Sequence, residues 1–250
     1  MEKRILEDGS FTLIEPTLQE AYHNRAGAFA EADFHYALPS VQHLENRHIP
    51  PETLVLWDVC FGLGYNSFAF LQRLLASERL KSVRHITIYT VDSDASLNLH
   101  WQDVLAQVHF EALTQAYRIP NTLKADALWQ WERRASNVPE FTVPELTWQI
   151  HFDDALSVLP QWETQQNTPV DVIFHDAFSP AKEPHLWSTE LFALYSRVLH
   201  PSAGCVLTYS LARRVKTAVE SAGLEWRKLP RLGGKDGALF IETLRVVLNR

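Results

Sequence analysis

The sequence of 250 residues contains little of what several protein classes depend on. It has two cysteines, Cys60 and Cys205, which rules out a disulfide framework or a cysteine-rich zinc site. Both lie in apolar runs, and we interpret them as small core residues. Eleven histidines are present, but there is no His-Glu-x-x-His or Cys-x-x-Cys pattern. No Gly-x-Ser-x-Gly motif occurs either, so the sequence predicts neither a metal site nor a serine hydrolase.

Long hydrophobic runs are also missing. No stretch approaches the roughly 18 apolar residues of a membrane span. The first ten residues, MEKRILEDGS, are charged where a secretory signal peptide has an apolar run. We therefore expect a soluble cytoplasmic protein. With 46% hydrophobic and 21% charged residues, the chain can form one large α/β domain rather than two small ones.

Positive charge is scarce in the first 200 residues, which hold 14 Lys or Arg against 26 Asp or Glu. Residues 201–250 reverse the balance, with nine Lys or Arg against four acids. This basic C-terminal face can meet an anionic partner on an otherwise acidic protein. The alternative is a set of scattered solvated side chains.

Apolar runs alternate with helix-period segments along the chain. Six runs read as strands: 54–61, 86–91, 146–152, 170–178, 204–210 and 238–248. Four segments between them have the period of amphipathic helices: 67–80, 153–162, 179–200 and 212–223. This alternation is typical of a doubly wound, mostly parallel sheet in an α/β fold.

The end of the chain departs from this alternation. The strand-like runs 224–230 and 238–248 are joined only by RLGGKDG, which is too short for a crossover helix, so an antiparallel hairpin is predicted. A seven-stranded sheet that ends this way is similar to class I, Rossmann-like, S-adenosylmethionine-dependent methyltransferases. We predict a single domain over 1–250, with an N-terminal arm (1–50), a core (51–250) and a helical insertion near 100–145.

A glycine turn joins the first predicted strand of the core to its helix. In DVCFGLGYNSFAFL, Gly62 and Gly64 let the backbone approach a bound nucleotide, because glycine has no Cβ and tolerates positive φ. We assign both glycines to cofactor binding, together with Asp58 before them and Asn66 after them. Cys60 stands where a first glycine is expected, so the turn alone is weak evidence.

Two more acids follow predicted strands where such a cofactor needs them. Asp92 ends ITIYTV and is placed to accept the ribose hydroxyls. Asp154 follows LTWQIHF and is placed to accept the adenine amino group, while its neighbour Asp153 is the alternative cap of the following helix. Helix capping or turn chemistry is the alternative for each acid singly; their joint order favours the cofactor.

The fourth predicted strand ends in HDAFSPAKEPHLW, and Asp176 is expected to face the methyl acceptor. Because side chains alternate along a strand, His175 should then point into the packing of the sheet, and a general-base role for it is the less favoured alternative. Phe178 and Trp187 can wall a flat substrate or can belong to the core.

These residues resemble a known family. The glycine turn FGLGYNS, the loop DAFSPAKEPHLW and the segments LTYSLARRVKTAVESAGL and GGKDG are similar to the methyltransferase domain of MnmC-type enzymes. Near the N-terminus, DGSFTL and EAYHNRAGAFAEA resemble the arm over that family's active site. The similarity runs along nearly the whole chain.

The resemblance implies transfer of a methyl group from S-adenosylmethionine to the primary amine of 5-aminomethyl-2-thiouridine at the tRNA wobble position. It implies Asp176 as the catalytic contact to the amine, with Tyr22 and Glu31 helping to close the site. Phe178, from the loop after the fourth strand, is the third residue expected on the substrate side. It also implies tRNA as partner and a functional link to the enzyme that makes the aminomethyl group. The alternatives are a methyltransferase of a small primary amine and a non-enzymatic nucleotide-binding or partner-binding domain.

Overall fold

The computed structural model describes residues 1–117, 128–131, 143–165, 167–230, 232 and 237–243. Its main sheet contains these strands, listed by sequence: β4 (Thr53–Val59), β5 (His85–Asp92), β6 (Leu128–Trp131), β7 (Glu145–Phe152), β8 (Val172–His175), β9 (Cys205–Thr208), β10 (Leu224–Lys228) and β11 (Leu239–Thr243).

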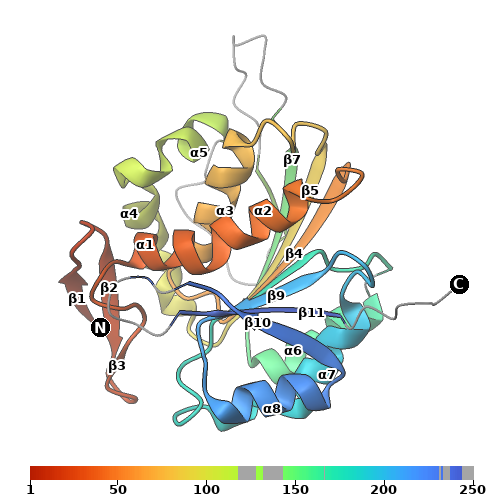
Figure 1. Ribbon diagram of the computed structural model, residues 1–250. Helices are drawn as coiled ribbons and strands as arrows, with labels where there is room; N and C mark the ends of the chain where they lie inside the picture. Colours follow the sequence, from red (N-terminus) through yellow and green to blue (C-terminus); the bar gives the residue numbers. More distant parts are fainter. Residues whose placement is uncertain (118–127, 132–142, 166, 231, 233–236, 244–250) are drawn as a thin grey trace, which may run out of the picture.

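The spatial order of the sheet is β10-β11-β9-β8-β4-β5-β7-β6 (Figure 1). The five strands from β9 to β7 run parallel, and β10 and β11 form the antiparallel hairpin at one edge. All seven predicted strands are present, which confirms the predicted fold class. A short eighth strand, β6, pairs antiparallel with β7 at the other edge.

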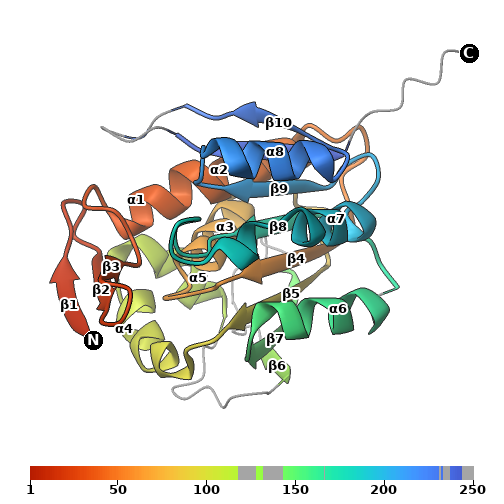
Figure 2. The same cartoon turned by 90° about the horizontal axis from the view of Figure 1, so that it is seen from below.

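The helices cover both faces of this sheet. One face carries α1 (Ala28–Ala32), the π-helical turn η1 (Asp33–Ala37), α2 (Leu38–Glu45), α3 (Tyr65–Ala76), α4 (Trp101–Leu105) and α5 (Glu111–Ala116). The other face carries α6 (Ala155–Gln165), α7 (Thr189–Val198) and α8 (Arg213–Ser221). Figure 1 shows the sheet between the two layers, and in Figure 2 the layer with α6, α7 and α8 lies in front of the sheet. Each layer buries its own cluster of apolar side chains against the sheet.

A separate three-stranded sheet lies beside this body (Figure 1). It is formed by β1 (Glu2–Ile5), β2 (Phe11–Glu15) and β3 (Glu20–Ala21). The buried hydroxyl of Tyr65 in α3 donates to the backbone oxygen of Phe11 at 3.1 Å. This contact ties the small sheet to the helix that follows the glycine turn.

The region expected as a helical insertion is described in part. It begins with the 3-10 helix η2 (Ala95–His100) and continues through α4, a second 3-10 helix η3 (Val108–Phe110) and α5. It then contributes the strand β6. Residues 118–127 and 132–142 lie outside the described part of the chain. Within the described ranges, no helix is long and apolar enough to cross a membrane.

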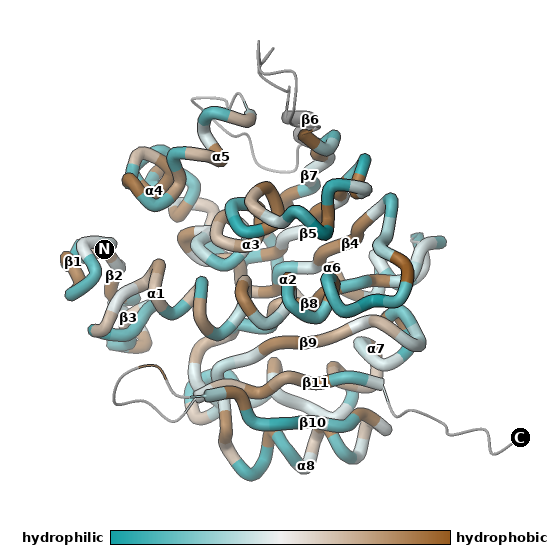
Figure 3. Tube along the Cα trace, turned by 45° about the horizontal axis from the view of Figure 1, so that its top comes forward, coloured by the Kyte–Doolittle hydropathy of each residue, from teal (hydrophilic) through white to brown (hydrophobic). Residues whose placement is uncertain are grey.

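Hydropathy follows the layers. Figure 3 shows apolar segments along β9 and β11 in the sheet, whereas β10 at its edge is hydrophilic. The sequence of β10, LEWRK, buries only its first residue. An edge strand with charged side chains discourages pairing with another chain.

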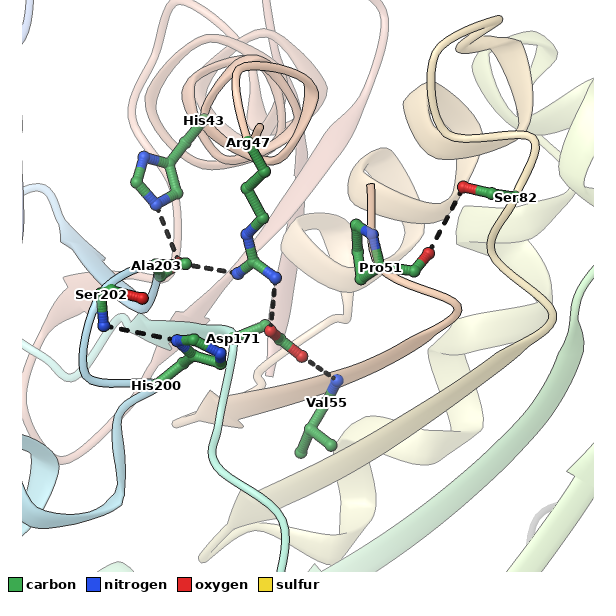
Figure 4. A network of polar contacts seen from close by, with 9 residues as sticks. All are labelled: His43, Arg47, Pro51, Val55, Ser82, Asp171, His200, Ser202 and Ala203. Carbon is green, nitrogen blue, oxygen red and sulfur yellow. Dashed lines mark hydrogen bonds and ion pairs between the residues drawn. The ribbon is translucent and has the colours of Figure 1, made fainter. Parts of the chain in front are cut away.

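A buried polar network lies at the end of the sheet where β8 begins. Asp171 accepts from the Arg47 guanidinium at 2.7 Å and from the Val55 N–H at 2.8 Å (Figure 4). Arg47 also donates to the Ala203 oxygen at 2.6 Å. Both charged side chains are at most 10% exposed. The network joins the C-terminal end of α2 to three segments of the sheet.

Candidate active site

A cavity lies at the opposite end, where β4, β5, β7 and β8 finish. It has a volume of about 610 Å³, within the range of small-molecule sites. Its walls come from these strand ends, from the loop after β8 and from the N-terminal arm. Nine lining residues are Asp or Glu, and none of the described lining residues is Lys or Arg. The cavity therefore suits a cationic ligand.

The glycine turn joins β4 to α3 next to the cavity. Gly62 and Gly64 have φ of 57° and 84°. A Cβ on Gly64 would lie 2.7 Å from the rings of Phe61 and Phe68, so only glycine fits there. The turn is held to β5, because the Gly62 N–H donates to the Asp92 carboxylate at 2.7 Å. Neither glycine lines the cavity described here.

The two cysteines differ in their surroundings. Cys205 lies in β9 and is fully buried, as expected. Interpreting Cys60 as a core residue is wrong: it is partly exposed, lines the cavity and adopts φ of 63°. This left-handed conformation disfavours residues with a Cβ. It is the physical reason why glycine suits this position of the turn.

Asp58 lies beneath the turn. It is fully buried, does not line the cavity, and accepts from the Ser67 hydroxyl at 2.6 Å. Burial raises the pKa of this carboxyl well above its ordinary value. Its placement supports the start of α3, whereas the sequence analysis assigned Asp58 to the cofactor.

Asp92 lies at the end of β5 and lines the cavity. It accepts from two backbone N–H groups, those of Gly62 and Asp94. Burial, the largest influence, raises the pKa of Asp92 to about 6, against the opposing effect of these hydrogen bonds. A carboxylate at this strand end is in the place predicted for the acceptor of the ribose hydroxyls.

Asp153 and Asp154 both line the cavity after β7. The carboxylate of Asp154 accepts from the Leu156 N–H at 3.2 Å in the first turn of α6. Asp153 accepts from the N–H of Asp154 instead. The helix-capping alternative therefore falls on Asp154 rather than on Asp153, and Asp154 borders the cavity while it caps.

Asp176 follows β8 and lines the cavity from the side opposite β5. Its two oxygens accept from the Tyr36 hydroxyl at 2.6 Å and from the Asn66 side-chain amide at 2.8 Å. Asn66 was assigned to the cofactor, but here it contacts the predicted catalytic carboxylate. Tyr36 was not predicted, because a single tyrosine in a helical segment does not indicate a partner 140 residues away.

His175 points away from the cavity, as the alternation along β8 predicted. It is fully buried, and its Nδ1 lies 2.9 Å from the Tyr195 hydroxyl. Burial lowers the pKa of His175 to about 3, so it is neutral. Trp187 packs its ring against His175 at 4.5 Å and is 2% exposed. Trp187 therefore belongs to the core, the second of its two predicted roles.

The arm covers the cavity from outside. Tyr22, Glu31 and Phe178 all line it, and the rings of Tyr22 and Phe178 lie 4.9 Å apart. The Ser179 hydroxyl donates to Glu20 of β3 at 3.1 Å. The arm and the loop after β8 thus meet across the opening, and the three predicted substrate-side residues lie together.

Comparison with known proteins finds similar sequences among methyltransferases. A family of S-adenosyl-L-methionine-dependent methyltransferases matches residues 121–241. The tRNA 5-methylaminomethyl-2-thiouridine biosynthesis bifunctional protein MnmC of Burkholderia vietnamiensis is 31% identical over 94% of the chain. The Azoarcus sp. protein of the same name is 28% identical over 92%. The chain spans about a third of the length of these relatives.

The chain is similar to S-adenosyl-L-methionine-dependent methyltransferases over residues 121–241 and to the MnmC proteins along most of its length. The crystal structure of MnmC2 from Aquifex aeolicus shares the fold, with a TM-score of 0.67 and 24% identity. That match covers 98% of this chain and 70% of the other.

The residues present fit S-adenosylmethionine, the cofactor of the family whose model matches residues 121–241. The molecule carries a sulfonium and an ammonium group, and the acidic lining complements both charges. Asp92 offers acceptor oxygens to a diol at the end of β5. Among the described residues, no group of three or more His, Cys, Asp or Glu is arranged to hold a metal ion.

Proposed function

We propose that this methyltransferase transfers a methyl group to the primary amine of 5-aminomethyl-2-thiouridine at the tRNA wobble position. The observation that carries the proposal is Asp176, a carboxylate fixed by two donors at the wall of an acidic cavity. A fixed acceptor suits an amine N–H, and the absence of Lys or Arg from the described lining disfavours an anionic acceptor group. The name of the MnmC relatives refers to this modification.

S-adenosylmethionine, when bound, supplies an electrophilic methyl group on a sulfonium. The amine must be neutral to attack it, and a free amine of this type has a pKa of about 10. An acidic cavity favours the charged amine, so the proton needs an acceptor. Asp176 is placed to accept an N–H and orient the lone pair, and we assign it as the first acceptor of the proton that leaves the nitrogen. Much of the rate enhancement then comes from positioning.

The acceptor needs a primary amine that another enzyme must leave on the uridine. We therefore propose a functional link to the enzyme that makes the aminomethyl group. The decisive experiment mixes the protein, labelled S-adenosylmethionine and tRNA carrying 5-aminomethyl-2-thiouridine, followed by nucleoside analysis. Label in 5-methylaminomethyl-2-thiouridine is expected. Methylation of a free primary amine, with no label in tRNA, would instead support the small-amine alternative.

We further propose that tRNA phosphates contact the basic C-terminal face. Arg213 starts α8 beside Pro184, whose loop forms one wall of the acidic cavity. Arg227 and Lys228 are exposed on β10. Arg231 and Lys235, which belong to the same basic stretch, lie outside the described residues. Cations outside the acidic cavity would bind the phosphates of tRNA, while the cavity itself would accept the amine.

The basic face is tested by replacing Arg213, Arg227 and Lys228 with Ala together. The Michaelis constant for tRNA should rise, and the log-log dependence of affinity on salt should flatten by about 0.7 to 0.9 per lost contact. S-adenosylmethionine affinity should not change.

The matched control removes three exposed cations, Arg79, Lys81 and Arg84, from the segment before β5, at the other end of the sheet. An equal effect of both triple replacements on tRNA would argue against a localised RNA face.

A further inference from the structure

Tyr36 lies behind the cavity and does not line it. It is fully buried and belongs to the π-helical turn η1, between α1 and α2. A π turn inserts one residue into a helix, and such turns are frequent at functional sites. The segment is therefore a candidate for a role beyond packing.

Three contacts hold Tyr36 and the turn that carries it. Its ring meets Phe174 of β8 edge to face, with centroids 5.5 Å apart. The Ser40 hydroxyl donates to its backbone oxygen at 2.7 Å. At the start of the turn, Asp33 forms an ion pair with Arg73 of α3. The ring of Tyr36 is thus packed on β8 and its backbone is tied to α2, while the ion pair ties the turn to α3.

The fixed hydroxyl donates to Asp176 at 2.6 Å, while Asn66 donates to the other oxygen of the same carboxylate. Burial, followed by the charge of Asp176, raises the pKa of Tyr36 well above its ordinary value, so the hydroxyl keeps its proton. Each carboxylate oxygen has more than one acceptor site. Accepting from Tyr36 and Asn66 therefore does not prevent Asp176 from also accepting from a group inside the cavity.

We propose that Tyr36 is a positioning residue for methyl transfer: with Asn66, it sets the direction in which Asp176 presents its carboxylate to the acceptor amine. This inference rests on the proposed function, in which Asp176 contacts the amine. Tyr36 touches neither the cavity nor the expected cofactor contacts, so its loss should slow turnover without weakening cofactor binding.

The first test is Tyr36→Phe, which removes the hydroxyl and keeps the ring. The turnover number on tRNA carrying 5-aminomethyl-2-thiouridine should fall at least about tenfold, while the dissociation constant for S-adenosylmethionine stays within about twofold. The matched control is Tyr117→Phe. Tyr117 is also fully buried, and its hydroxyl donates to the Pro144 oxygen at 2.9 Å, away from the cavity. The control should keep wild-type turnover.

A double-mutant cycle separates positioning from general loosening of the fold. In an Asp176→Asn background, Tyr36→Phe should change turnover by less than about twofold, because its target is already altered. An equal factor in both backgrounds would overturn the inference. Unchanged turnover of Tyr36→Phe in the otherwise wild-type protein would also overturn it, and would leave the proposed function intact.

A crystal structure of Tyr36→Phe tests the inference without activity. The Asp176 carboxylate is expected to rotate from its position in the unaltered protein, whereas Tyr117→Phe should leave it in place. An unmoved carboxylate in Tyr36→Phe overturns the positioning role. Failure of the unaltered protein to methylate any tested acceptor counts against the proposed function alone, because this structural result does not depend on it.

Discussion

One strand, β8, has an aspartate at each end, and the two aspartates have different surroundings. Asp171, just before the strand, is buried and paired with the guanidinium of Arg47 (Figure 4). Asp176, just after it, is partly exposed to the cavity and accepts from two neutral side chains. The same residue type thus forms a buried ion pair at the start of the strand and faces the cavity at its end.

The two aspartates differ in the charge of the side chains that donate to them. Arg47 satisfies Asp171 with a full opposite charge in a buried place, so removing either member leaves an unpaired buried charge. Neutral donors hold the geometry of Asp176 without adding a cation beside it. The strand therefore separates a stabilising carboxylate from one that remains able to accept from a substrate.

Removing the charge partner of Asp171 should have the largest effect on stability. Arg47→Met leaves Asp171 buried without its charge partner, and we expect a loss of about 3 to 5 kcal/mol in the free energy of unfolding, measured with denaturant. The control is Arg197→Met, which removes an exposed pair with Glu163 and should cost less than about 1 kcal/mol. Equal losses of unfolding free energy in the two variants would show that the buried ion pair contributes no more to stability than the exposed one.

A third carboxylate sharpens the comparison at the cavity end. Asp92→Ala should weaken S-adenosylmethionine binding by about 1 to 3 kcal/mol, since hydrogen bonds to a buried diol are lost. Isothermal titration calorimetry measures the change. Unchanged affinity in a folded variant would remove Asp92 from the cofactor site.

The same carboxylate predicts a pH dependence. Burial raises the pKa of Asp92 to about 6, so in the cofactor-free protein it becomes neutral as the pH falls through that value. The ionised form is the better partner for a cationic cofactor, and affinity should therefore decrease below about pH 6 and level off above pH 7. Titrations of Asp92→Asn should give a flatter profile between pH 5 and 7. Identical profiles would assign the titration to another group.

Neutralising the other end of β8 should affect catalysis rather than stability. For Asp176→Asn we expect turnover to drop at least about tenfold, or about 1.4 kcal/mol in the activation barrier, while S-adenosylmethionine still binds. Steady-state kinetics and calorimetry on one preparation test both parts. Wild-type turnover would mean that the amine is held elsewhere.

Cys60→Gly should give the smallest effect. Glycine relieves the left-handed strain of about 1 to 2 kcal/mol but adds about 0.5 to 1 kcal/mol of chain entropy, so the free energy of unfolding should change by less than about 1 kcal/mol. Cys205→Gly, in the middle of the sheet, should be clearly destabilising. Denaturant unfolding measures the change in the free energy of unfolding for both variants. A large loss in Cys60→Gly would show that its side chain supports the turn.

The sequence alone predicts the sheet, because apolar runs of strand length alternate with helical periodicity and the last two runs are too close for a crossover. It also placed Asp92, Asp154 and Asp176 around one cavity, since parallel strands finish at the same edge. The alternation of side chains along β8 correctly turned His175 away from that cavity.

The groups that meet across long distances in the chain are set by the tertiary structure. It brought Tyr36 and Asn66 to Asp176, buried Asp58 beneath the turn and placed Trp187 in the core. It also put Cys60 in a left-handed conformation beside the cavity. Local pattern reports which face of an element is apolar, but the partner of a polar side chain depends on how separate elements pack. That packing is set by the whole core rather than by any one segment.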